Sequence, residues 1–269
     1  METKMGKPIR RAAGLFSKLH DELIGVPVDF STLDLTAYAP ELIEHAQHVW
    51  AGRVRSEFRS VQTMTRFLTE VMASRDPLDV YAGAGDLIMD ELRHVSLCVR
   101  VVEALGGRAD YPEPAVVVQN QEFLSLPMPQ RALSTAISML AVSETLSTGY
   151  ITDLHGRCTQ PAIHAVLDAT IADEDTHHEF GWRYVEKSLA RFTDGMEYFR
   201  LVVKNTLQPH LAAVEQILSD VPLHKKHLDA WPEPELASLG LHSNERQALV
   251  FLQTYQQELA PKLDALGLL

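Results

Sequence analysis

The chain has 269 residues, of which 46% are hydrophobic, so it can bury a sizeable core as one large domain or two small ones. Its formal net charge of −12 and its pI near 5.4 argue against a nucleic-acid-binding surface, which needs clustered Lys and Arg. Two cysteines, Cys98 and Cys158, are too few for a disulfide framework, a rubredoxin-type site or a four-cysteine zinc site.

Helical patterns dominate from the N-terminus onwards. The first 25 residues contain a short amphipathic segment with basic residues but no long apolar run, so we expect no secretory signal. No segment has the roughly 20 apolar residues that a membrane span requires. A helix is predicted from Pro40 to about Ser74. A second runs from about Leu78 to Leu105 and is ended by Gly106-Gly107.

A long proline-rich connection separates this pair of helices from a second pair. The third helix follows Pro129 and runs to about His155, and the fourth runs from about Ala162 to Phe192. The predicted order is two helices with a short connection, a long crossover, and two more helices with a short connection. This order predicts a four-helix bundle of two antiparallel hairpins.

Further helices are predicted after the bundle. One covers about 196–218, although Pro209 should kink or break it. After a proline-broken stretch, another covers about 244–259. The sequence therefore predicts an all-α protein with one helical domain over residues 1–269. Its four-helix core spans about 40–192, and the extra helices lie within about 196–264.

Acidic and histidine residues fall on the apolar stripes of the four core helices. The motif Asp-Glu-x-x-His occurs twice and places a glutamate and a histidine on one helix face each time. The helix before each motif adds one glutamate to its own apolar stripe. The six residues are Glu57, Glu91, His94, Glu144, Glu174 and His177. Burying unpaired charges costs several kcal/mol or more, so we expect cations to compensate them.

Four carboxylates and two neutral imidazoles are a suitable ligand set for two divalent metal ions in a bundle core. Carboxylates can bridge two such ions about 3.5–4 Å apart. Two alternatives remain open for single ligands. Glu44 and Glu70 share the helix of Glu57, and His178 could replace His177 at the i+4 spacing.

These residues and their spacing resemble the ferritin-like di-iron carboxylate superfamily. The resemblance covers the four helices from about 40 to 192, but not the first 35 residues or the tail after about 220. The acid before each motif glutamate is similar to that of the bacterial multicomponent hydrocarbon hydroxylases. There it supports the histidine ligand of the opposite helix, which implies that Asp90 orients His177 and that Asp173 orients His94. The alternative is that both are solvated helix acids.

Two more positions resemble that oxygenase branch. Cys98 lies one turn after His94, where the ribonucleotide reductase small subunit carries its radical tyrosine and the hydroxylases carry a cysteine, so a tyrosyl-radical role is disfavoured. Thr148 lies one turn after Glu144, where the hydroxylases have a hydroxyl near the O2 site, which implies proton delivery. Thr148 could equally bond a carbonyl of its own helix.

The resemblance implies a non-haem di-iron oxygenase or oxidase that uses O2 to oxidise a small organic substrate. The cofactor would be two iron ions, although manganese or a mixed centre also suits these ligands. Electrons would come from a separate ferredoxin or reductase, and we expect a cytoplasmic homodimer. The alternatives are a ferroxidase, iron-handling or peroxidase-type protein, and a helical interaction protein with vestigial motifs. A helical interaction protein with vestigial motifs would have to bury its charged side chains without metal ions.

Overall fold

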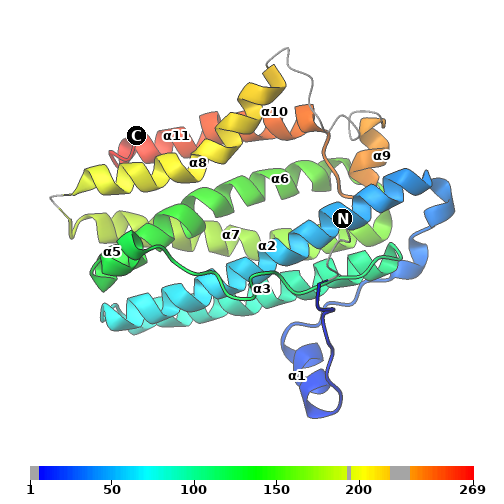
Figure 1. Ribbon diagram of the computed structural model, residues 1–269, viewed down its shortest axis with the longest axis horizontal. Helices are drawn as coiled ribbons and strands as arrows, with labels where there is room; N and C mark the ends of the chain where they lie inside the picture. Colours follow the sequence, from blue (N-terminus) through cyan, green and yellow to red (C-terminus); the bar gives the residue numbers. More distant parts are fainter. Residues whose placement is uncertain (1–5, 193–194, 219–230) are drawn as a thin grey trace. The chain divides into compact units, whose positions relative to one another are not determined.

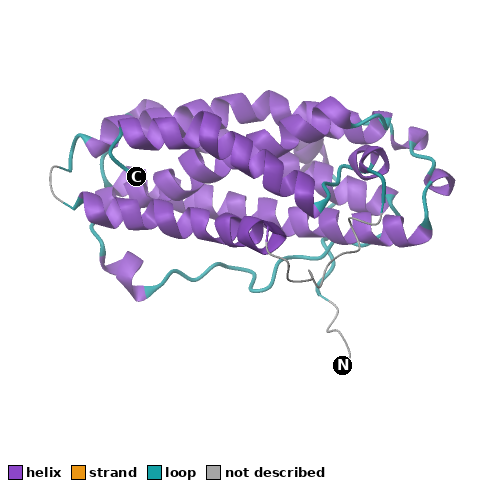
Figure 2. Ribbon diagram, turned by 90° about the horizontal axis from the view of Figure 1, so that it is seen from above, coloured by secondary structure: helices purple, strands orange, loops and turns teal. Residues whose placement is uncertain are grey.

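The computed structural model describes residues 6–192, 195–218 and 231–269, and its regular structure within these ranges is helical (Figures 1 and 2). In the described residues the only pairing of β type is an isolated bridge between Pro8 and Asp110. The prediction of an all-α protein is therefore confirmed. None of the described helices combines the length and apolarity needed to cross a membrane.

The helical elements follow one another along the chain, with a long connection between the two predicted hairpins. In order they are α1 (Leu15–Leu23), the 3-10 turns η1 (Phe30–Thr32) and η2 (Leu35–Ala37), α2 (Pro40–Ala73), α3 (Leu78–Ala104), α4 (Gln121–Ser125), α5 (Met128–Thr135), the π-helix η3 (Ala136–Ser143), α6 (Glu144–Arg157), α7 (Pro161–Leu189), α8 (Met196–Leu218), α9 (Glu233–Ser238), α10 (Asn244–Thr254), the π-helix η5 (Tyr255–Leu259) and α11 (Ala260–Ala265).

Two compact units make up the chain. Unit 1 comprises residues 1–126 and 160–169, and unit 2 comprises residues 127–159 and 170–269, so one of the boundaries between them falls inside α7. Each unit is described by itself below.

Unit 1 is built on the hairpin of α2 and α3, which pack side by side along their length (Figure 1). Both helices begin and end close to where the sequence predicts. Gly106 ends α3 with a φ of 78°, a left-handed conformation that suits glycine. Its N–H donates to the carbonyl of Glu103, and the next N–H, of Gly107, donates to Val102. The buried apolar residues of α2 recur at helical spacing: Leu42, Ala46, Trp50, Val54, Met64, Phe67 and Val71.

The Gln62 side chain of α2 holds the crossover that follows α3. The Gln62 amide donates to the carbonyl of Ala115 over 2.7 Å and accepts from the N–H of Val117 over 2.9 Å. The neighbouring residues Val116 and Val118 are exposed. The glutamine thus supplies the two hydrogen bonds that an extended strand partner would otherwise provide.

We expect Gln62→Ala to release this crossover. The two lost hydrogen bonds are worth about 1 kcal/mol each, so cleavage next to Val116 and Val118 by proteinase K should become roughly 30 times faster. The rate is measured by mass spectrometry of timed digests. Thr65→Ala is the control, because its hydroxyl bonds only Val61 of its own helix. Equal cleavage rates in the two variants would contradict the role of Gln62.

Unit 2 begins with one continuous helical run from α5 through η3 to α6. The sequence predicts a single α-helix here, whereas residues 136–143 form a π-helix, in which the bonds reach five residues back. The Ser143 hydroxyl follows the same step and donates to the carbonyl of Ser138 over 2.8 Å. Within this unit, α7 comes so close to η3 that a β-carbon at Gly181 would lie 2.1 Å from the carbonyl oxygen of Leu140.

Pro209 lies inside α8 and does not end it, so of the two expected outcomes, a kink or a break, the break does not occur. The helix runs from Met196 to Leu218 with the proline inside it, and its yellow ribbon changes direction part-way along (Figure 1). The proline removes one backbone hydrogen bond, but the buried side chains on both sides of it keep the helix packed. These are Phe199, Val203, Leu207 and Val214.

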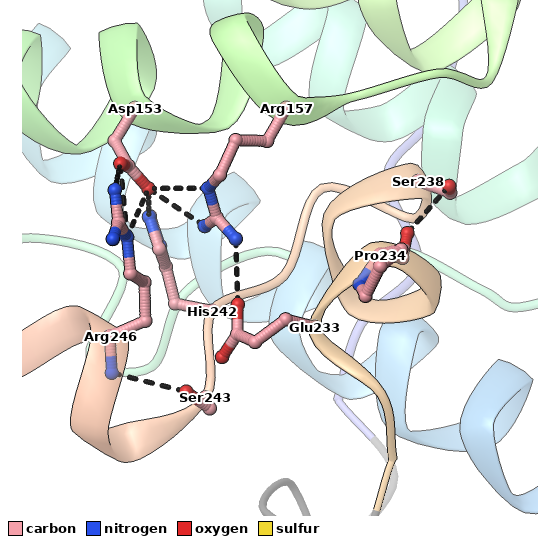
Figure 3. Close-up of polar contacts among 8 residues, drawn as sticks. All are labelled: Asp153, Arg157, Glu233, Pro234, Ser238, His242, Ser243 and Arg246. Atoms are coloured by element: carbon pink, nitrogen blue, oxygen red, sulfur yellow. Dashed lines mark hydrogen bonds and ion pairs between the residues drawn. The ribbon is translucent and has the colours of Figure 1, made fainter.

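The tail of unit 2 is tied to α6 by a polar cluster (Figure 3). Asp153 of α6 accepts hydrogen bonds from Arg157 and Arg246 and contacts the Nε2 atom of His242 at 3.0 Å. Arg157 also donates to Glu233 over 2.6 Å. The last predicted helix is present as α10 and η5, and α11 extends it to Ala265.

Candidate metal centre

Unit 1 brings together three of the six predicted ligands. Glu57 comes from α2, and Glu91 and His94 come from adjacent turns of α3. The Nδ1 atom of His94 lies 3.9 Å from Oε2 of Glu57 and 3.8 Å from Oε2 of Glu91. One ligand atom from each of the three residues lies within 4.8 Å of the others. The i, i+3 spacing of the motif therefore produces the expected convergence within this unit.

The Glu57 side chain is more exposed than the side chains of the two motif residues. Glu91 and His94 are only 2% and 1% exposed, whereas the Glu57 side chain is 23% exposed. Of the alternatives on the same helix, Glu44 is exposed and Glu70 is buried 3.3 Å from the Nε atom of Arg66. The geometry of unit 1 thus favours Glu57 over both.

Unit 2 contains the other three predicted ligands. Glu144 is the first residue of α6, immediately after the π-helix, and Glu174 and His177 lie on α7. The Nδ1 atom of His177 is 3.9 Å from Oε2 of Glu144. Glu144 and Glu174 are each 3% exposed, and His177 is fully buried. His178 instead places its Nε2 atom 2.7 Å from Nζ of Lys262, so the geometry of unit 2 favours His177 as the ligand.

These separations suit a shared cation better than a hydrogen bond. Metal–nitrogen and metal–oxygen bonds of about 2.1 Å place two ligands of one ion up to about 4.2 Å apart. The Nδ1–Oε2 distances of 3.8 and 3.9 Å fall just inside that limit and outside hydrogen-bonding range. Carboxylate and imidazole ligands suit Fe, Mn and Zn. In unit 1 the three residues present therefore fit a divalent metal ion. In unit 2 Glu144 and His177 have the same spacing, but among the described residues Glu174 does not join them in a cluster of three ligand atoms.

Comparisons with known proteins do not identify the chain. No protein-family model, curated protein or solved structure matches it. The assignment of a metal centre therefore depends on the residues and geometry of this chain alone.

The two motif aspartates lie in different surroundings. Asp90 is buried and accepts a 2.5 Å hydrogen bond from Nη1 of Arg93, whereas Asp173 is half-buried. The arginine between the two motif residues thus balances the charge of Asp90. Orientation of His177 by Asp90 and of His94 by Asp173 stays a prediction.

Thr148 and Cys98 each lie one turn after a predicted ligand. The Thr148 hydroxyl donates to the carbonyl of Glu144 over 2.9 Å, which is the local bond that the sequence analysis considered as the alternative to proton delivery. Cys98 is buried. Burial raises the pKa of the Cys98 thiol well above its ordinary value, and the charge of Glu57 raises it further, so the thiol remains protonated at neutral pH.

The sequence analysis missed the π-helix that ends at Glu144. No residue type in Ala136–Ser143 signals the change from α- to π-helix. The packing around it is specific. Trp182 of α7 donates its Nε1–H to the hydroxyl of Thr145 over 3.0 Å, and that hydroxyl donates to the carbonyl of Ala141 over 2.6 Å. π-Helical turns occur frequently at functional sites, and here one sets the position of a predicted metal ligand.

Proposed function

We propose that this protein is a non-haem di-iron oxygenase or oxidase. Its six predicted ligands, three from each unit, would hold two iron ions, and manganese could replace one or both. The observation that supports the proposal most strongly is the same in both units. A buried histidine turns its Nδ1 atom towards a glutamate oxygen at a distance suited to a shared cation.

The protein's own groups supply binding and orientation. The buried glutamates of α3, α6 and α7 provide negative charge in surroundings from which water is excluded, which strengthens their attraction for cations. The imidazoles of His94 and His177 bind in their neutral form through Nδ1. The Arg93–Asp90 ion pair limits the net negative charge beside Glu91. A ferritin-like arrangement of the four core helices is part of the proposal.

Two bound ferrous ions would supply electrons to O2 and a place for it to bind. A small organic substrate would be hydroxylated, N-oxygenated or desaturated. A monooxygenase reaction consumes two further electrons, which we assign to a separate ferredoxin or reductase because two buried cysteines cannot form a rubredoxin-type site.

Metal analysis of single variants tests the ligand assignment. Apo-protein is loaded with Fe(II) without oxygen, desalted and analysed by plasma mass spectrometry. We expect two iron ions per chain in the wild type and one or fewer in Glu91→Ala and in Glu174→Ala. Asp86→Ala on α3 and Glu179→Ala on α7 are the matched controls, since both acids are exposed, and they should keep two ions. Two ions in each ligand variant would show that the assignment is wrong.

Oxygen consumption separates the oxygenase from an iron-handling protein. Loaded wild-type protein with a chemical reductant should consume O2 faster when a suitable organic compound is added and should convert that compound. A ferroxidase or storage protein would consume O2 in proportion to added Fe(II) alone, and a storage protein would elute as a large cage on gel filtration. That second pattern would refute the oxygenase proposal while leaving the metal ligands in place.

A further inference from the structure

Unit 2 contains a cavity that has no part in the proposed metal chemistry. It measures about 450 Å³ and lies between α6, α8 and α10. Its wall combines three aromatic rings with small apolar side chains and amides, among them Tyr150, His210, Phe251, Ala213, Val214 and Gln247. Sites for small molecules commonly measure 300–1,000 Å³ and have mainly apolar walls with a few polar groups. In size and composition the cavity is suitable for a molecule of one or two rings.

The aromatic rings of the wall are nearly parallel to one another. The ring of His210 lies on that of Phe251, with centroids 5.3 Å apart and planes 7° apart. The ring of Tyr150 is 6.5 Å from His210 at an angle of 26°, and its other neighbour is the edge of His242 at 5.8 Å. Phe251 also stacks on Tyr255, with centroids 6.0 Å apart. Rings that stack on one another use their faces and leave their edges, and edge-to-face contact with such edges favours an aromatic ligand.

Two polar groups of the wall retain unused hydrogen-bonding capacity. Within the described part of the chain, neither the Tyr150 hydroxyl nor the His210 ring makes a hydrogen bond. Burial raises the pKa of Tyr150 to about 12 and lowers the pKa of His210, so both are uncharged at neutral pH. The phenol and the imidazole can therefore each donate and accept a hydrogen bond.

The wall carries no formal charge. None of the described residues that line the cavity is Lys, Arg, Asp or Glu. The Asp153 cluster reaches this wall through His242, which contacts both Tyr150 and Asp153, and there Arg157 and Arg246 already compensate the carboxylate. An ionic ligand would lose its hydration without gaining a counter-ion, so the cavity selects against charge.

We propose that this cavity binds a small, uncharged aromatic molecule that carries one hydrogen-bonding group. The ligand ring packs against the aromatic wall, and its polar group pairs with the hydroxyl of Tyr150. The inference goes beyond the proposed function and does not depend on the metal ligands, so it is tested on the whole chain as purified.

Calorimetric titration with indole and with 2-naphthol tests the site. We expect saturable binding of both compounds, with one site per chain at pH 7.5, and at least tenfold weaker binding to Ala213→Phe, whose ring fills the cavity. Ala212→Phe is the matched control: it adds the same ring to the adjacent exposed alanine of α8, which does not line the cavity, and should bind like the wild type. If Ala213→Phe does not fold, Gln247→Trp fills the cavity from α10 instead.

The hydroxyl is tested separately. Tyr150→Phe should weaken binding about fivefold, as expected for one lost hydrogen bond, whereas Tyr198→Phe at the start of α8 should leave it unchanged. The proposal is overturned if neither compound binds saturably to the wild type, or if the filled variants bind as tightly as the wild type. Unchanged affinity in Tyr150→Phe would overturn the hydrogen bond assigned to it. Because none of the six predicted metal ligands lines the cavity, the outcome of these titrations is independent of the di-iron proposal.

Discussion

Replacing Gly181 by alanine should strongly destabilise unit 2, although the substitution adds only one methyl group. The new β-carbon would lie 2.1 Å from the carbonyl oxygen of Leu140, 2.4 Å from its carbonyl carbon and 2.8 Å from its β-carbon. Two of these atoms belong to the backbone of η3 and cannot rotate away. To accommodate the methyl group, α7 and the π-helix must move apart, which disturbs the contact between Trp182 and Thr145.

We expect Gly181→Ala to lower the free energy of unfolding by about 3–5 kcal/mol, because overpacking against backbone cannot be relieved by a rotamer change. For a chain of this length that corresponds to a decrease in Tm of roughly 10 °C. Urea unfolding followed by circular dichroism measures the loss. The displacement of η3 should also shift Glu144, so iron loading should decrease in the same variant.

Gly156→Ala is the matched control for Gly181→Ala. Gly156 lies inside α6, is exposed and has no atom within 4 Å of the added β-carbon. Alanine favours helix over glycine by up to about 1 kcal/mol, so this variant should be as stable as the wild type or slightly more stable. If both variants unfolded at the same urea concentration, the close approach of α7 to η3 would be refuted.

Removing the Asp153 carboxylate should produce the second large loss of stability. The Asp153 side chain is only 12% exposed and accepts hydrogen bonds from two guanidinium groups (Figure 3). In Asp153→Ala the Arg246 guanidinium loses its carboxylate partner, while Arg157 keeps Glu233. Removing one partner of a buried ion pair costs about 3–5 kcal/mol. Because both arginines are partly exposed, we expect the free energy of unfolding to decrease by about 3 kcal/mol, the lower end of that range.

The same cluster makes stability depend on pH. Burial by itself would raise the pKa of Asp153, but hydrogen bonds from Arg246 and Arg157 outweigh it, so the pKa lies below its ordinary value of 3.8. The folded state therefore binds fewer protons than the unfolded state in this range. The stabilisation is present above pH 4 and is lost as the pH falls below it.

Urea unfolding at pH 7, 4 and 3 checks both expectations. The wild type should lose stability steeply between pH 4 and pH 3, and Asp153→Ala should lose less over the same interval. Glu215→Ala, at an exposed position of α8, is the control and should follow the wild type within about 0.5 kcal/mol at each pH. If the stability of Asp153→Ala decreased with pH in parallel with that of the wild type, Asp153 would be excluded as the group responsible for the pH dependence.

Much of this protein could be predicted from the sequence because the signals are local. The spacing of apolar residues places α2, α3 and α7 within a few residues of their observed bounds, and Gly106 ends α3 because its own backbone permits a left-handed turn. The same periodicity identifies Glu91 and His94 as inward-facing, since three residues along a helix bring two side chains onto one face.

Tertiary contacts decided the remaining features. Pro209 is tolerated inside α8, residues 136–143 widen into a π-helix, and Asp153 becomes the centre of a charge cluster with residues almost a hundred positions away. None of these features has a local pattern, because each depends on which segments pack against one another. Local spacing determines which side of a helix is buried, but the identity of the buried neighbour depends on packing energies summed over residues far apart in the chain.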